Sequence, residues 1–162
     1  MLAAEDGNSD IVRVLAEQEK KSRDDSGKTA LMHAAEHNHL DCVKILAPLE
    51  ERLQDSGSHT ALMIATEKDN SDIVRVLASR ETGTRDRWGR TALMLSARTG
   101  AATPLLFPFE AGLADKFGQN QTWYAASTLT GVLRAIRFEK TVGWLLEGKT
   151  ILEARVNSRS VS

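Results

Sequence analysis

Short apolar runs separated by polar turns recur at a fixed interval along the chain. The run Thr-Ala-Leu-Met stands at 29–32, 60–63 and 91–94, a step of 31 residues each time. The nine residues at 8–16 are repeated unchanged at 70–78, which is twice that step. Self-similarity at a period of about 20 to 50 residues is typical of stacked repeat architectures. The pattern therefore predicts an array of similar units.

Within one unit the pattern predicts two short helices joined by a polar turn. The first, over 30–35, follows Thr29, which is suited to capping, and consists of good helix formers. Asn38 ends it, because asparagine tolerates a left-handed backbone. The second helix, over 40–47, places apolar side chains on one face, and we expect Pro48 to end or bend it. Helices of about two turns are unstable alone in water, so neighbouring units have to cover them.

The repeat frame predicts where the units begin and end. We expect an array over 1–126, with units at 1–23 (partial), 24–54, 55–85, 86–114 and 115–126 onward. Ser58 stands where the other units have the turn glycine and lies next to Gly57, so we expect that turn to be shifted by one residue. We expect 127–154 to form a degenerate repeat or capping helices, and 155–162 to be disordered.

One unit combines a turn, a first helix and a second helix. Its motif is Asp24-x-x-Gly27-x-Thr29-Ala30-Leu31-Met32-x-Ala34-Ala35, followed by Val43-x-x-Leu46. This motif resembles the ankyrin repeat, whose usual form is D-x-x-G-x-T-P-L-H-x-A-A and then V-x-x-L-L. Methionine replaces the family's histidine, so the usual threonine–histidine hydrogen bond at the helix start is missing. The Thr-Ala-Leu-Met variant with a late glutamate in the unit is similar to ankyrin-repeat proteins of some flagellate protist parasites. The resemblance implies an all-α solenoid of stacked helix-turn-helix units with projecting turns.

The resemblance also implies a function: binding another protein through the turn tips and the concave face of the first helices. We call the residues that occupy the same place in successive units a column. The columns that correspond to this surface hold Asp25, Ser26, Lys28, Glu36, His37, Ser56, His59, Glu67, Lys68, Arg87, Trp88, Arg90, Arg98 and Thr99. Trp88 is the strongest candidate, because tryptophan and arginine dominate binding hot spots. Its indole could equally fold back over the stem of an arginine in a neighbouring repeat. Both interpretations stay open at this point.

A second hypothesis concerns the context of the array. Met1 falls inside a repeat, in the column of Met32. The chain could therefore be a regulatory or targeting segment of a larger enzyme, such as a protein kinase that carries an ankyrin array. The array itself is expected to have no catalytic activity.

Composition and charge narrow the class of partner. The chain has 21 basic and 22 acidic residues, so no overall field draws it to nucleic acid or to a membrane surface. No apolar stretch approaches the length of a membrane span. A single cysteine, Cys42, favours a reducing compartment. We expect a monomeric, cytoplasmic protein that binds another protein, with nuclear or cytoskeletal association left open.

One motif could carry metal chemistry. The stretch from His33 to His37 matches H-x-x-E-H, a zinc-peptidase pattern. The repeat frame already explains it, because its alanines are the small pair of the unit and its polar residues occupy variable columns. Catalytic zinc also requires a third protein ligand. Cys42 shares its column with Ile11 and Ile73 and is expected to pack in the core. The sequence therefore predicts no metal and no cofactor.

Overall fold

The computed structural model describes residues 1–18, 21–99 and 102–126. All regular elements in this part of the chain are helices: α1 Leu2–Glu5, α2 Ser9–Leu15, α3 Ala30–Glu36, α4 Leu40–Glu50, α5 Ala61–Glu67, α6 Ser71–Glu81, α7 Ala92–Thr99, α8 Thr103–Glu110 and α9 Gln121–Ala126. The expected all-α fold is confirmed. The helices expected at 127–154 and the tail expected at 155–162 lie outside the described residues.

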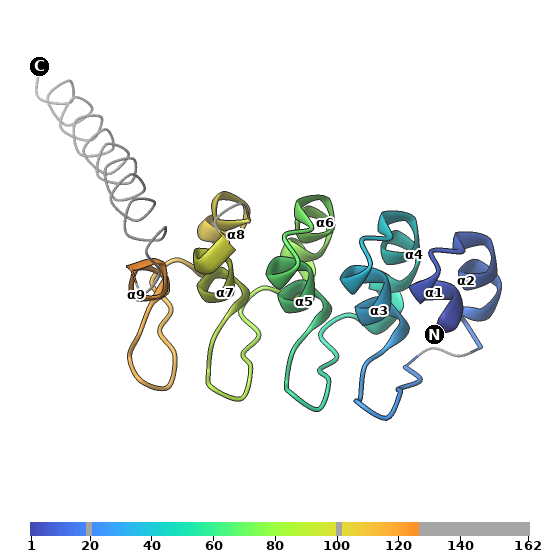
Figure 1. Ribbon diagram of the computed structural model, residues 1–162, viewed down its shortest axis with the longest axis horizontal. Helices are drawn as coiled ribbons and strands as arrows, with labels where there is room; N and C mark the ends of the chain where they lie inside the picture. The colour runs from blue at the N-terminus through green and yellow to red at the C-terminus, as the bar shows by residue number, and fades with distance from the viewer. Residues whose placement is uncertain (19–20, 100–101, 127–162) are drawn as a thin grey trace, which may run out of the picture.

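The helices stack in two parallel rows. The first helices of the units, α1, α3, α5, α7 and α9, each contact the next in the row, and so do the second helices α2, α4, α6 and α8. The turns that precede the first helices project side by side from the same edge of the stack (Figure 1). The molecule is therefore a helix-turn-helix solenoid with a row of projecting tips.

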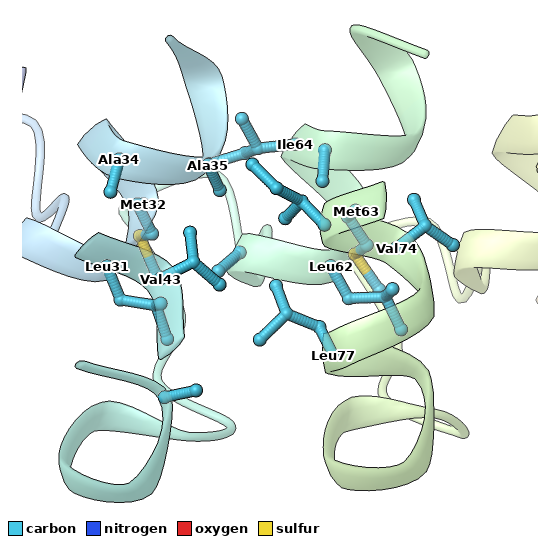
Figure 2. Packing of buried hydrophobic residues seen from close by; sticks show 14 of the residues in the cluster. Leu31, Met32, Ala34, Ala35, Val43, Leu62, Met63, Ile64, Val74 and Leu77 are labelled. Atoms are coloured by element: carbon cyan, nitrogen blue, oxygen red, sulfur yellow. The ribbon is translucent and has the colours of Figure 1, made fainter. Parts of the chain in front are cut away.

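The core runs through the stack between the two rows. Leu31 and Met32 of α3 are fully buried, and Leu62 and Met63 repeat them in α5 (Figure 2). The small pairs Ala34–Ala35 and Ala65–Thr66 are buried, and such small side chains permit the close approach of α3 and α5. Cys42 also lies in this core, as its column predicted, and burial raises the pKa of its thiol.

An aspartate at the start of each turn fixes the shape of the tip. Oδ1 of Asp24 accepts hydrogen bonds from the backbone N–H groups of Ser26 and Lys28. Asp55, Asp86 and Asp115 make the same two bonds in their own turns. A carboxylate that accepts several hydrogen bonds favours its charged form. The Ser26 hydroxyl, with the backbone bonds, accordingly holds the pKa of Asp24 well below its usual range.

The residue before each aspartate ties its own turn to the next unit. Nη1 of Arg23 donates to the carbonyls of Gly27 and of Gln54, one unit further on. Nε2 of Gln54 likewise donates to the carbonyl of Ser58 in its own turn and to that of Arg85 in the next unit. Nη1 of Arg85 donates to the carbonyls of Gly89 and of Ala114 in the same way. This ladder of bonds holds the tips at a fixed spacing.

The turn at Ser58 is not shifted, so that prediction was wrong. Ser58 has a φ of 65°, and Gly27 in the same column has a φ of 78°. The N–H of Ser58 donates to the carbonyl of Asp55 over 2.9 Å, as that of Gly27 does to the carbonyl of Asp24. The bonds made by Asp55 keep the turn in register, and Ser58 accepts the left-handed conformation despite its Cβ.

Pro48 does not end the second helix. α4 continues through it to Glu50. The helix end is held by Glu50, which is buried and whose carboxylate accepts hydrogen bonds from the N–H groups of Leu31 and Lys21. These tertiary contacts outweigh the loss of one backbone donor at the proline. Asn38, in contrast, ends α3 as predicted, with a φ of 62°.

The cap of the first helix is a glutamate rather than the expected threonine. The side chain of Thr29 makes no cap hydrogen bond, and Thr60 accepts only a long one, of 3.4 Å, from Met63. The carboxylates of three buried glutamates instead accept a bond from the first turn of the first helix of their own unit; the pairs are Glu50–Leu31, Glu81–Leu62 and Glu110–Leu93, at 2.8 to 2.9 Å. The late glutamate of the motif therefore closes each helix pair.

Candidate functional site

The residues proposed for partner binding fall into two regions of the surface. One is the row of tips, which holds Asp25, Ser26, Lys28, Ser56, His59, Arg87, Trp88 and Arg90. The other is the C-terminal end of the first helices, where Glu36, His37, Glu67 and Lys68 lie. Arg98 and Thr99 are at the end of α7, but their side chains lie outside the described part of the structure.

Three of the predicted residues bind one another. Nζ of Lys28 lies 2.6 Å from Oε2 of Glu36, and Nζ of Lys68 lies 3.4 Å from Oε1 of the same carboxylate. The hydrogen bond from Lys28 lowers the pKa of Glu36, which burial alone would raise. Two lysines share this one carboxylate, so the group keeps a net charge of +1 and links the units 24–54 and 55–85. Lys28 and Glu36 are half-buried, whereas about half of the Lys68 side chain is exposed.

Histidines take structural positions in the same region. Nε2 of His33 donates a 2.9 Å bond to Oδ2 of the charged Asp24 and so links α3 to its own turn. His37 is exposed, and its Nδ1 lies 3.0 Å from the carbonyl of His33. His59 is half-buried beside Asp55. In the part of the chain that the structure describes, no group of three histidine, cysteine or acidic side chains is placed to hold a metal ion.

Trp88 lies at the tip of the unit 86–114 and is 43% exposed. The guanidinium of Arg90 lies 4.5 Å from the centre of the indole ring, and that of Arg87 lies 5.3 Å from it. Cation–π contacts at these distances hold the ring in place. The indole therefore packs against arginines of its own turn and still presents part of its surface to solvent. The arginines that cover the ring belong to its own turn and not to a neighbouring repeat, so that alternative was wrong in its partner. The role of Trp88 as a binding anchor stays a prediction.

Two exposed residues of the next tip, Lys116 and Phe117, were not among those predicted from the sequence. Phe117, in the same column as Trp88, is 73% exposed. Lys116, in the column of Arg87, donates from its backbone N–H to the carbonyl of Trp88 over 3.2 Å. The repeat frame could have identified both residues, because it had already aligned this turn with the others.

The last described unit is also ordered by side-chain bonds. The hydroxyl of Tyr124 donates to Oδ2 of Asp115 over 2.7 Å. Burial, together with this bond, raises the pKa of Tyr124 to about 12. Asn120 caps α9 by accepting bonds from the N–H groups of Thr122 and Trp123. The tip that carries Phe117 is thus fixed to the helix behind it.

Comparison with known protein families adds to this geometry. The family described as ankyrin repeats (3 copies) matches residues 1–86. No curated protein matches the chain. Among the described residues, none of the helices has the length and apolar character needed to cross a membrane.

Proposed function

The chain belongs to the ankyrin-repeat family, and from this premise we propose that it binds another protein through its turn tips and the exposed ends of its first helices. Ankyrin repeats are generally protein-interaction modules. The proposed activity is binding alone, without a chemical step or a cofactor. Function carried by a fold depends on a particular site, so the proposal rests on what the tips present.

The observation that carries the proposal is the exposed indole of Trp88 at a fixed tip. Tryptophan offers a large, rigid contact area at a low cost in conformational entropy. Arg87 and Arg90 restrain the ring in the free protein. This restraint reduces the conformational entropy that is lost when a partner binds. The columns that hold the fold together repeat from unit to unit, whereas the tip column changes from Ser26 to Gly57 to Trp88. An exposed column that varies while the aspartate of each turn stays the same is typical of a recognition surface.

The test uses the full chain as bait in a selection from a displayed peptide library. Chemical-shift mapping by NMR then locates the selected peptides on the chain. We expect them to contact the tips and the first-helix ends. Trp88→Ala should weaken their binding by about 2 kcal/mol, a typical hot-spot loss. It should lower the free energy of unfolding by less than about 1 kcal/mol, because only exposed cation–π contacts are lost.

Phe109→Ala is the matched control, since Phe109 is an exposed aromatic on α8, in the second-helix row. It should leave peptide affinity unchanged. Peptides that map to the second-helix row, or an affinity that Trp88→Ala does not change, would contradict the proposed surface. An affinity that Trp88→Ala does not change would also show that the role of Trp88 is purely structural.

A further inference from the structure

Two of the exposed aromatic residues lie on adjacent tips, 86–90 and 115–119, which we call the aromatic tips. In the tip column, Ser26 and Gly57 of the earlier units give way to Trp88 and Phe117. These two side chains are 43% and 73% exposed. An exposed pair of large aromatic side chains on neighbouring loops marks an interaction site more often than a single one does. The chemistry of the tips themselves indicates what the site can accept.

The two aromatic tips are joined directly. The N–H of Lys116 donates to the carbonyl of Trp88 over 3.2 Å, and its Nζ donates to the carbonyl of Arg87 over 2.6 Å. Gly89 makes the approach possible, because a Cβ there would lie only 2.9 Å from the backbone nitrogen of Lys116. The two aromatic side chains are therefore presented from loops whose backbones are fixed to each other.

Two of the three cationic side chains on the aromatic tips, Arg87 and Lys116, have no counter-ion among the described residues. Arg87 donates to the carbonyls of Ser56 and Gly57, and Lys116 to that of Arg87, so both use backbone oxygens. Within the described part of the chain, no carboxylate forms an ion pair with either side chain. Arg90, in contrast, is paired with the buried carboxylate of Asp86.

The tips of the earlier units have neither an exposed aromatic side chain nor an unpaired lysine or arginine. The tip 24–28 carries the exposed acid Asp25, and its Lys28 is paired with Glu36. The tip 55–59 contains neither lysine nor arginine. Unpaired positive charge and exposed aromatic surface thus coincide on the aromatic tips and do not extend along the row.

We propose that the aromatic tips bind an acidic segment of the partner protein that also carries an apolar side chain. Its carboxylates form charge-assisted bonds with Arg87 and Lys116, and its apolar side chain packs against Trp88 and Phe117. This inference rests on the proposed function and specifies the chemistry of the partner. A single-stranded nucleic acid also combines negative charge with stacking surfaces. It normally follows a continuous basic track, and the charge here is confined to two tips.

The test measures the binding of labelled peptides to the full chain by fluorescence anisotropy. The probe peptide contains glutamates and two leucines. One comparison peptide has glutamine in place of glutamate, another has serine in place of leucine, and a single-stranded DNA oligonucleotide serves as a fourth probe. We expect the acidic, leucine-containing peptide to bind at least about tenfold more tightly than each of the other three. Added salt should weaken its binding, because screening reduces attraction between exposed charges.

Variants assign the binding to the aromatic tips. The double variant Arg87→Glu with Lys116→Glu, and the double variant Trp88→Ala with Phe117→Ala, should each weaken the probe by about tenfold or more. Arg75→Glu, at an exposed position of α6, is the charge-matched control for Lys116→Glu alone, and Phe109→Ala is the aromatic control. Both should change affinity by less than about twofold. If Arg87→Glu unfolds the tip, the single variant Lys116→Glu can be used in its place. Its backbone N–H still donates to the carbonyl of Trp88, and it should still weaken binding of the probe.

Failure of this inference can be told apart from failure of the proposed function. If the library yields neutral or basic peptides that map to the tips, the proposed function stands and the acidic partner is overturned. Equal binding of the glutamine peptide, tighter binding of the oligonucleotide, or no binding of the probe would each overturn it as well. If the selected peptides avoid the tips altogether, both proposals fail.

Discussion

At the scale of single residues, the buried glutamates connect parts of the chain that are distant in sequence. Glu81, at the end of α6, accepts a hydrogen bond from the N–H of Leu62 at the start of α5 and another from the N–H of Arg52. One carboxylate thus fixes both helices of a unit and the segment that enters the unit. The N–H groups at a helix start have no partner within the helix, so an external acceptor is needed.

Replacing Glu81 by glutamine should therefore destabilise the fold. The amide keeps the shape but turns one acceptor into an N–H₂ donor that faces a backbone N–H. Leaving a buried donor unsatisfied costs about 1 to 3 kcal/mol, and we expect Glu81→Gln to lower the free energy of unfolding by that amount. Urea denaturation at neutral pH measures it. Glu67→Gln, at an exposed position near the end of α5, is the control and should have little effect.

The same variant makes a prediction about pH. Burial raises the pKa of Glu81, although the bonds from Leu62 and Arg52 partly oppose the shift. A group whose pKa is higher in the folded state binds its proton more tightly there. Its contribution to stability is complete below its unfolded pKa and is lost as the pH rises through the folded pKa. The stability difference between the wild type and Glu81→Gln should thus be larger near pH 4.5 than at neutral pH; a difference that grows with pH would contradict this.

Residue-level chemistry was only partly predictable from the sequence. The recurrence of the late glutamate was visible, but its partner was not, because Glu50 and Leu31 are 19 residues apart and meet only in the folded unit. Thr29 matched the local signal for a cap and makes no cap bond. Phe117 could have been predicted, since its column was known. Local sequence patterns therefore showed which positions recur in every unit, but not which residues form hydrogen bonds with each other.

At the scale of elements, the tips interlock through backbone bonds, with one exception. The N–H of Ser56 donates to the carbonyl of Ser26, and that of Lys116 donates to the carbonyl of Trp88. The described backbone bonds include no counterpart between the tips 55–59 and 86–90. Glycine permits the close approach in the other two cases, whereas Ser58 brings a Cβ into this column. Arg87 bridges the same two tips with its guanidinium instead.

Ser58→Gly should accordingly stabilise the protein. A left-handed conformation costs a residue with a Cβ about 1 to 2 kcal/mol, and the larger entropy of glycine in the unfolded chain offsets part of the gain. We expect a net increase of about 0.5 to 1 kcal/mol in the free energy of unfolding. Asn38→Gly is the control at a φ of 62°, and it should gain less, because asparagine tolerates this conformation. A less stable Ser58→Gly variant would show that the serine is not strained.

Helix positions were predicted more reliably than helix ends. The sequence placed the first helix of the second unit at 30–35 and the structure has Ala30–Glu36, because Asn38 is a strong local stop. The second helix extends to Glu50, past the end predicted at Pro48, because a tertiary contact holds its last turn. A local signal fixes an end only where no tertiary contact competes with it.

At the scale of the whole molecule, burial is uneven along the stack. In α5 every residue from Ala61 to Thr66 is buried, whereas in α2 only Val12 is. Val14 and Ile11 of α2 are 70% and 46% exposed. A small cavity also lies between the first two helix pairs, bordered by Val12 and Leu46 among others. Stability in a solenoid is approximately a sum of unit and interface terms, so these differences predict a gradient of local stability.

Hydrogen exchange measures this gradient directly. Amide protons of α1 and α2 should exchange fastest among the described helices, because α1 has only 4 residues and α2 exposes much of its apolar surface. Those of α5 and α6 should exchange slowest. Leu62→Ala should reduce protection in the helix pairs on both sides of α5, since deleting a buried leucine costs about 2 to 5 kcal/mol and weakens two interfaces at once. Val12→Ala should reduce it mainly in α1 and α2. Uniform exchange rates along the chain, or the same response to both variants, would indicate a single cooperative unit rather than a stack of coupled ones.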